Sequence, residues 1–207
     1  MRLSTTKPTK KMQITKLLSV AAITFVLVGC AHPLTINPDV SKIGLSTTDQ
    51  PIKKNVAYYI PDTMRSKEVT TPGGGGDKVT YSPYRDIEVG FYKMLSNTFS
   101  SVTKLSTKND KDAIEKNKID YVITPDLLTN SSSSSALTWP PTQFSVDMTC
   151  DINDASGNLL FSKKVAGEGH AEYDEFKKDF SLAGKRATED VLVKMQRTLL
   201  DTQELRQ

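Results

Sequence analysis

The chain has 207 residues, with 27 lysine and arginine residues, 24 aspartate and glutamate residues, and a formal net charge of +3. Five of the basic residues and none of the acidic ones lie in residues 1–29, which leaves 22 basic against 24 acidic residues in the other 178. A net charge of about −2, with both signs interspersed, excludes the concentrated basic surface that duplex binding needs.

An apolar segment near the N-terminus has the anatomy of an export signal. A basic lead containing three lysines precedes twelve uncharged residues, 17–28. Twelve residues are too few to span a bilayer, which takes about 20. The segment ends in Leu27-Val28-Gly29-Cys30. We therefore predict a cleaved signal peptide over residues 1–29.

These four residues resemble the lipobox of bacterial lipoproteins. The resemblance implies cleavage between Gly29 and Cys30 and a diacylglycerol thioether on Cys30, which would attach the protein to a membrane. Ala31 stands where an inner-membrane retention signal typically places aspartate. Resemblance to Gram-negative lipoproteins therefore implies the outer membrane, with the domain facing the periplasm. The polar, proline-punctuated residues 30–52 are predicted to form the lipidated cysteine and a flexible tether.

Cysteine and histidine usage limits the chemistry of the exported part. Once Cys30 carries lipid only Cys150 is left, so no intramolecular disulfide can form, and we expect Cys150 to be buried. His32 and His170 each stand alone, without the spacing of metal ligands. We predict no metal and no cofactor.

The first half of the domain is predicted to hold a strand and a long helix. Residues 55–60, NVAYYI, are β-branched and aromatic and predict a strand. The glycine run 73–76 is followed by Asp77 instead of the Lys-Ser/Thr pair of a phosphate-binding loop, which favours a flexible loop. Ser82 begins a helix whose apolar residues recur at spacings of three and four as far as Val102.

The middle of the domain combines short elements with a polar loop. Residues 103–106 are predicted to be extended, residues 110–118 to form a small charged helix, and residues 119–124 to form a strand closed by Pro125. The serine run 131–135 predicts an exposed, mobile loop.

The strongest strand pattern covers residues 144–152, where apolar and polar residues alternate. Turn residues at 153–158 join it to a partner strand at 159–170, which predicts a half-buried antiparallel hairpin. Ser181 begins a last amphipathic helix, and residues 203–207 are predicted to be a polar tail.

This order predicts an α+β fold with a mixed, mainly antiparallel sheet of about four to five strands and two long helices packed on one face. We predict a single domain over residues 53–202. We also expect the apolar face of residues 144–152 to pack against the helix that ends at Val102.

The chain resembles small outer-membrane lipoproteins of the YajG type and the domain shared by the amino-terminal part of TolB and by LpoB. The resemblance lies in the element order, the lipobox and the sequence segments IDYVITPDLL and DASGN. The resemblance covers about residues 53–202. It implies a non-enzymatic accessory protein of the cell envelope that binds other proteins.

The residues themselves also lack a catalytic constellation. No Gly-x-Ser-x-Gly occurs. Glu168, His170 and Glu172 alternate on the polar side of a predicted strand, where a solvated face explains them better than catalysis. We therefore expect no enzymatic activity and name no catalytic residue.

Two functions remain open. The first is a lipid-anchored interaction module at the inner leaflet of the outer membrane, which binds an envelope protein or its own copy. Trp139, Pro140 and Pro141 would form the contact, because tryptophan anchors interfaces and prolines restrict its backbone. In the alternative interpretation Trp139 folds back onto the sheet. The second function is a periplasmic carrier or sensor of a small apolar or glycan ligand, held between helix and sheet in a cavity of roughly 300 Å³ or more.

Overall fold

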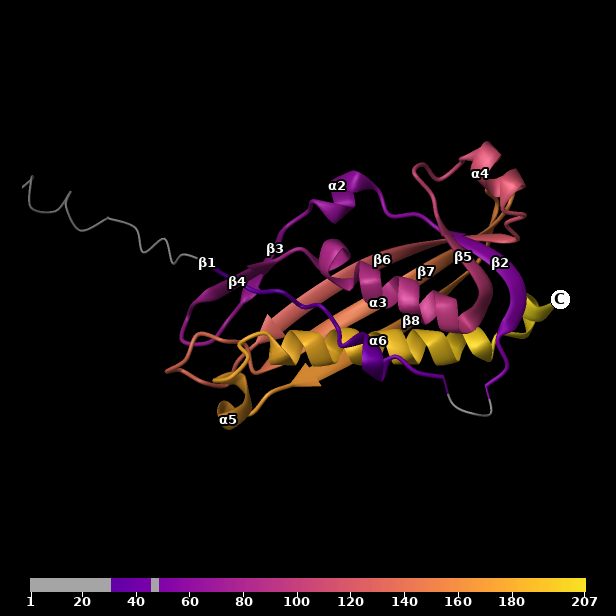
Figure 1. Ribbon diagram of the computed structural model, residues 1–207. Coiled ribbons are helices and arrows are strands. Elements are labelled where there is room, and N and C mark those ends of the chain that lie inside the picture. The colour runs from indigo at the N-terminus through magenta and orange to yellow at the C-terminus, as the bar shows by residue number, and fades with distance from the viewer. Residues whose placement is uncertain (1–30, 46–48) are drawn as a thin grey trace, which may run out of the picture.

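The computed structural model describes residues 31–45 and 49–207, so the predicted signal peptide and Cys30 lie outside the described residues. A sheet of long strands forms one layer and two long helices form the other (Figure 1). The elements in chain order are β1 (Ala31–Pro33), η1 (Val40–Lys42), β2 (Ile52–Tyr58), α2 (Asp62–Arg65), β3 (Val69–Pro72), β4 (Lys78–Tyr81), α3 (Pro83–Thr98), β5 (Phe99–Lys104), α4 (Lys111–Lys116), β6 (Tyr121–Ser132), β7 (Gln143–Asp154), β8 (Leu159–His170), α5 (Tyr173–Phe176), α6 (Leu182–Leu200) and η2 (Gln203–Arg206).

The main sheet has five strands in the order β5-β2-β6-β7-β8. β2 pairs in parallel with β5 and β6, whereas β6, β7 and β8 are antiparallel. A smaller sheet, β1-β4-β3, lies at one end of the long strands (Figure 1). The two long helices, α3 and α6, cover one face of the main sheet. The predicted α+β class, the mixed sheet and the two helices on one face are confirmed.

The alternation predicted for β7 is confirmed. Phe144, Val146, Met148, Cys150 and Ile152 are at most 3% exposed, and the residues between them are half-buried. The helix that covers this face is α6, which corrects the expectation that α3 does so. α3 runs directly into β5, the edge strand on the far side of the sheet, and therefore covers that side. The predicted burial of Cys150 is confirmed, and it raises the pKa of the thiol.

α6 approaches β8 closely because glycine leaves room for it. A Cβ at Gly169 would lie 2.0 Å from the carbonyl oxygen of Ala183. The α6 side chains of Arg186, Asp190 and Lys194 also form hydrogen bonds with the backbone of β8, the outer strand of the sheet. These bonds occupy part of the edge and oppose pairing with a further strand.

Several predicted boundaries differ from the structure, and two of them change how the sheet is built. α3 ends at Thr98 instead of Val102, because the next residues leave the helix and form β5 beside β2. β6 does not stop before Pro125 but continues to Ser132. The missing N–H of Pro125 costs no ladder bond, because the pairing of β6 with β2 ends at Ile123.

The segment predicted to be a flexible tether, residues 30–52, is folded wherever the structure describes it. Leu34, Ile36 and Ile43 are at most 7% exposed and belong to the main core. We call residues 34–43 the N-terminal arm. The prediction was wrong because the alternation of buried Leu34, Ile36 and Pro38 with exposed residues covers only residues 34–39, which is short for a pattern in a polar, proline-punctuated segment.

Hydrogen bonds hold the N-terminal arm between the two long helices. The Ile36 N–H donates to Oδ2 of Asp86 on α3 at 3.1 Å. The Ile36 carbonyl accepts a bond of 2.8 Å from Oγ1 of Thr188 on α6. The arm therefore gives two buried polar side chains a backbone partner, beside the contact of Asp86 with Arg85 and the bond of Thr188 to the Lys185 carbonyl.

The C-terminal residues predicted to be a tail also pack against the domain. Leu205, within η2, is fully buried. Arg206 donates to the carbonyl of Gln50 at 3.0 Å. The folded domain therefore extends beyond the predicted boundaries of 53 and 202 at both ends.

We expect Ile36→Ala to lower the free energy of unfolding by about 2–5 kcal/mol, the usual cost of truncating a buried aliphatic side chain. Thr35→Ala is the matched control, because it removes an exposed side chain next to Ile36 and should change stability by less than about 0.5 kcal/mol. Chemical denaturation of both variants measures the difference. Equal stabilities would contradict the folded arm.

Candidate functional site

One end of the domain gathers segments that are far apart in the sequence (Figure 1). They are β1 and residues 73–77, 133–139 and 173–180. We call this the β1 end, and we call the opposite end, formed by α4 and the β7–β8 turn, the α4 end. Because β1 directly follows Cys30 in the chain, the β1 end is the part of the domain nearest to the predicted lipid.

Trp139 lies at the centre of the β1 end. Its ring stacks on His32, with centroids 4.2 Å apart and planes at 19°, and tilts against Phe180 at 4.9 Å. It is half-buried and packs against the main core. This geometry favours the interpretation in which Trp139 folds back onto the domain. Sequence reasoning missed both ring partners, because each is distant from Trp139 along the chain.

Pro140 and Pro141, which were predicted to contact a partner together with Trp139, are buried. The chain turns inward here to enter β7, and the Thr142 N–H donates to the Ser132 carbonyl at 3.1 Å. The prediction is therefore wrong for the two prolines in the folded domain. They hold the backbone beneath Trp139 and do not form part of a contact surface.

Two segments predicted to be flexible loops bond to each other and support Trp139. The Gly74 N–H donates to the Trp139 carbonyl at 2.8 Å. This approach requires glycine, because a Cβ at Gly74 would lie 2.0 Å from the Thr138 carbonyl oxygen. Ser131, the first of the five serines, is buried at the end of β6 and donates to the Pro72 carbonyl at 2.6 Å.

Large apolar side chains are exposed at the β1 end. Leu137 is 95% exposed, Tyr173 is 62% exposed and Phe180 is 46% exposed. Single exposed apolar side chains are common on soluble domains, whereas a group of them indicates a contact. Leu137 and Phe180 come from the two segments that meet at Trp139, and β1, which follows Cys30 in the chain, lies at the same end.

An ion pair fixes the segment that carries Phe180. Arg186 of α6 donates to both carboxylate oxygens of Glu175 on α5, at 2.7 and 3.0 Å. The bond from Arg186 lowers the pKa of Glu175 from 4.5 to about 2. Arg186 also donates to the carbonyl of His170 at 2.7 Å, so one side chain joins α5, α6 and the end of β8.

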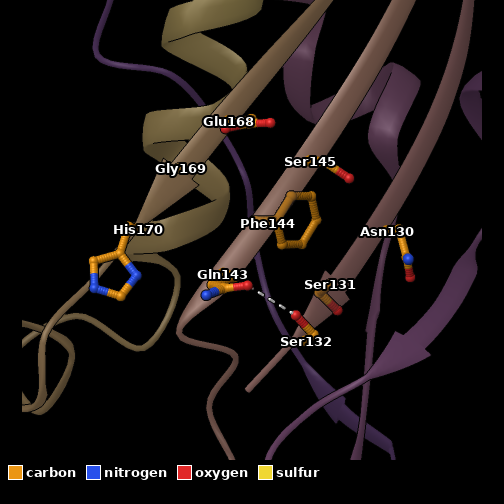
Figure 2. A pocket seen from close by; sticks show the side chains of 9 residues that line it. All are labelled: Asn130, Ser131, Ser132, Gln143, Phe144, Ser145, Glu168, Gly169 and His170. Atoms are coloured by element: carbon orange, nitrogen blue, oxygen red, sulfur yellow. Dashed lines mark hydrogen bonds between the residues drawn. The ribbon is translucent and has the colours of Figure 1, made fainter. Parts of the chain in front are cut away.

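The face of β6, β7 and β8 opposite α6 is open to solvent. We call it the open face. It carries alternating polar side chains and the large apolar side chain of Leu128, which is 69% exposed. Near the β1 end this face contains a hollow of about 420 Å³ (Figure 2). Its lining residues are Asn130, Ser131, Ser132, Gln143, Phe144, Ser145, Glu168, Gly169 and His170.

The polar groups in and beside this hollow form no catalytic arrangement. Ser132 donates to Gln143 at 3.4 Å (Figure 2). His170 Nε2 lies 2.8 Å from Glu172 Oε1, and both side chains are exposed. Glu168 is exposed as well, so the predicted solvated face is confirmed.

A second hollow, of about 480 Å³, lies at the α4 end between α4 and the β7–β8 turn. Asn153 lines it and is only 3% exposed. Its Nδ2 donates to the Gly157 carbonyl at 3.1 Å, but its buried Oδ1 accepts no bond from the described residues. A buried acceptor without a partner is unusual.

Among residues 31–45 and 49–207, no group of His, Cys, Asp and Glu side chains is placed to hold a metal ion. Within the same ranges, the helices are all too short or too polar to cross a membrane.

No family model and no curated protein matches this chain. Several solved structures are similar to it. A Xanthomonas campestris protein of the DUF330 family is 10% identical with a TM-score of 0.47, over 83% of this chain and 91% of that one. The PelC dodecamer from Paraburkholderia phytofirmans is 12% identical with a TM-score of 0.44, over 77% and 96%. A candidate lipoprotein from Caulobacter crescentus is 12% identical with a TM-score of 0.34, over 64% and 85%. These TM-scores are all below 0.5, so the proposed function rests on this chain's own residues.

The pair of Arg186 and Glu175 predicts an acid-sensitive α5. Because the pKa of Glu175 is lower in the folded protein, its stabilising contribution is present above about pH 4.5 and is lost as the pH falls towards about 2. We expect Arg186→Gln to return the pKa of Glu175 towards 4.5. An NMR titration of the Glu175 carboxyl measures it, with Lys178→Gln as the control. An unchanged pKa in Arg186→Gln would contradict the pair.

Proposed function

We propose that the protein is a lipid-anchored accessory protein of the bacterial cell envelope that acts as a protein-interaction module without enzymatic activity. The sequence Leu27-Val28-Gly29-Cys30, placed directly before a folded strand, supports a lipid anchor at Cys30. Ala31 in place of aspartate supports the inner leaflet of the outer membrane, with the domain in the periplasm.

An anchor at Cys30 would leave little slack between membrane and domain. β1 begins at Ala31 and pairs with β4 from that residue on. The β1 end would therefore lie at the bilayer, and the α4 end would point away from it. β7 and β8 each have 12 residues, which corresponds to about 40 Å. The open face would extend over that distance into the periplasm.

The open face supports binding of a protein partner. Leu128 lies two residues from Asn130 on the same side of β6, so an exposed apolar side chain adjoins the polar hollow of about 420 Å³. Protein interfaces combine an apolar centre with a polar rim in this way. The edge of β8 is partly occupied by α6 side chains, which favours binding to the face over addition of a strand.

We expect Leu128→Arg to abolish capture of the partner from native membranes and to leave the melting temperature unchanged, because Leu128 is exposed. Val89→Arg is the matched control, since Val89 on α3 is 68% exposed and lies away from the open face. Crosslinking followed by affinity capture of the lipidated protein makes the measurement. Full capture by Leu128→Arg would exclude this face.

Cys30→Ser tests the anchor. Each methylene buried in a bilayer contributes about 0.8 kcal/mol, so removal of the acyl chains should transfer the exported protein to the soluble fraction. The variant should also incorporate no labelled palmitate, whereas Cys150→Ala should keep its label. A Cys30→Ser protein that stays in the membrane fraction and still takes up palmitate would refute the anchor.

A ligand carrier is the second candidate function. The space between helices and sheet, where a ligand was expected, is filled by side chains such as Phe91, Met148 and Met195, all fully buried. The hollow at the α4 end is a better place, because its volume of about 480 Å³ exceeds the roughly 300 Å³ of a ligand site and Asn153 lines it. A copurifying small molecule that shifts the Asn153 side-chain NMR signals would support this function.

A further inference from the structure

We infer that the β1 end docks into the headgroup layer of the membrane that holds the lipid anchor, with Leu137, Trp139 and Phe180 as the contact residues. The inference rests on the proposed lipid at Cys30. It adds a second membrane contact, made by the folded domain itself, which sets the orientation of the domain as well as its location.

Chain connectivity brings Trp139 to the bilayer. The Cα atoms of Cys30 and His32 are at most about 7 Å apart, because two extended residues span no more. The His32 ring in turn stacks on Trp139 with centroids 4.2 Å apart. The headgroup layer on each side of a bilayer is about 5–7 Å thick. The stacked rings therefore lie close to the membrane surface when Cys30 carries its lipid there.

The exposed side chains at the β1 end suit a membrane interface. Tryptophan and tyrosine are enriched at this depth of a bilayer, because their rings are apolar and carry a polar group. Leu137, at 95% exposure, gains almost no burial from the domain. Phe180 contacts Trp139 with part of its surface and leaves 46% exposed. Insertion of these side chains removes from water apolar surface that the fold leaves uncovered.

The charges of this end favour apolar insertion over electrostatic attraction. Lys177, Lys185 and Arg186 each pair with an acidic side chain in residues 174–179, which leaves Lys178 as the one exposed lysine of this segment without an ion pair among the described residues. Paired charges neither repel an anionic leaflet nor form the polybasic cluster that binds one. We therefore expect the contact to depend little on the fraction of anionic lipid.

The anchor also favours a lipid surface over a second copy of the chain as the occupant of this end. Because Ala31 belongs to β1, every anchored molecule would bring its β1 end to the bilayer. A second anchored copy would lie at the same height and would approach from the side. The surface that faces the β1 end directly is the membrane.

Trp139 is the only tryptophan of the chain, so its fluorescence reports on the β1 end alone. The lipidated protein is reconstituted into phosphatidylethanolamine and phosphatidylglycerol vesicles, and its emission is measured with brominated lipids and with aqueous iodide. We expect quenching by the brominated lipids and protection from iodide. Quenching by iodide without quenching by brominated lipids would overturn the inference. Protection that depends on protein density instead of lipid would also overturn it, because a second copy would then cover Trp139.

Leu137→Asp tests the contact without touching the core. It should remove most of the quenching by brominated lipids and leave the melting temperature unchanged, since Leu137 makes few contacts. Leu160→Asp is the control, because Leu160 is 47% exposed and lies in β8 near the α4 end. Equal quenching in Leu137→Asp and the wild type would overturn the inference that the β1 end docks into the headgroup layer.

Intact-mass measurement of the same sample separates this inference from the proposed function. A protein without a lipid mass on Cys30 would refute the anchor itself. A lipidated protein whose Trp139 stays open to iodide would refute only the docking of the β1 end.

Discussion

The packing of the N-terminal arm between α3 and α6 is the constraint on which the rest of the molecule depends. Asp86 is only 4% exposed, and a buried carboxylate needs hydrogen-bond donors. The Ile36 N–H supplies one, while the Ile36 carbonyl satisfies the buried hydroxyl of Thr188. Without the arm both helices would expose apolar surface, Asp86 would keep only its contact with Arg85, and Thr188 would keep only its bond to the Lys185 carbonyl. The arm therefore belongs to the core, and β1 continues it up to the residue that follows Cys30.

This constraint gives the two faces of the main sheet different surroundings. α6 lies so close to β8 that only glycine fits at position 169, and the arm closes the helical layer. The apolar face of the sheet is thereby covered by the helices and the arm, whereas the open face keeps its polar side chains in water. With the β1 end at a bilayer, the open face would stand along the normal to the membrane. A partner in the periplasm would then reach Leu128 from the side, without displacing any part of the fold.

Periodic segments were predictable from the sequence, and segments that pack without a period were not. The alternation around Val146 and the apolar stripe of α6 each have a repeat that matches their secondary structure, so class, register and burial of Cys150 were correct. The N-terminal arm alternates between buried and exposed residues only over residues 34–39, and its polar composition resembled that of a tether. The serine and glycine runs were expected to be mobile because of their composition. Composition does not reveal tertiary hydrogen bonds, such as the one from Gly74 to Trp139. The stacking of His32 on Trp139 joins residues more than a hundred positions apart, and no local pattern reveals it.

Trp139 unites the two interpretations that its sequence left open. One side of the ring is held by His32, Phe180 and the core, as expected of a residue that folds back. The side chain is nevertheless only half-buried, which leaves part of it available to a contact surface. Because the buried prolines after it fix the backbone, little conformational entropy is lost when the exposed part binds. Because the ring is held rigidly by the domain, its contact with the membrane would also fix the orientation of the strands relative to the membrane. A ring on a mobile loop would attach the chain but leave the domain free to rotate.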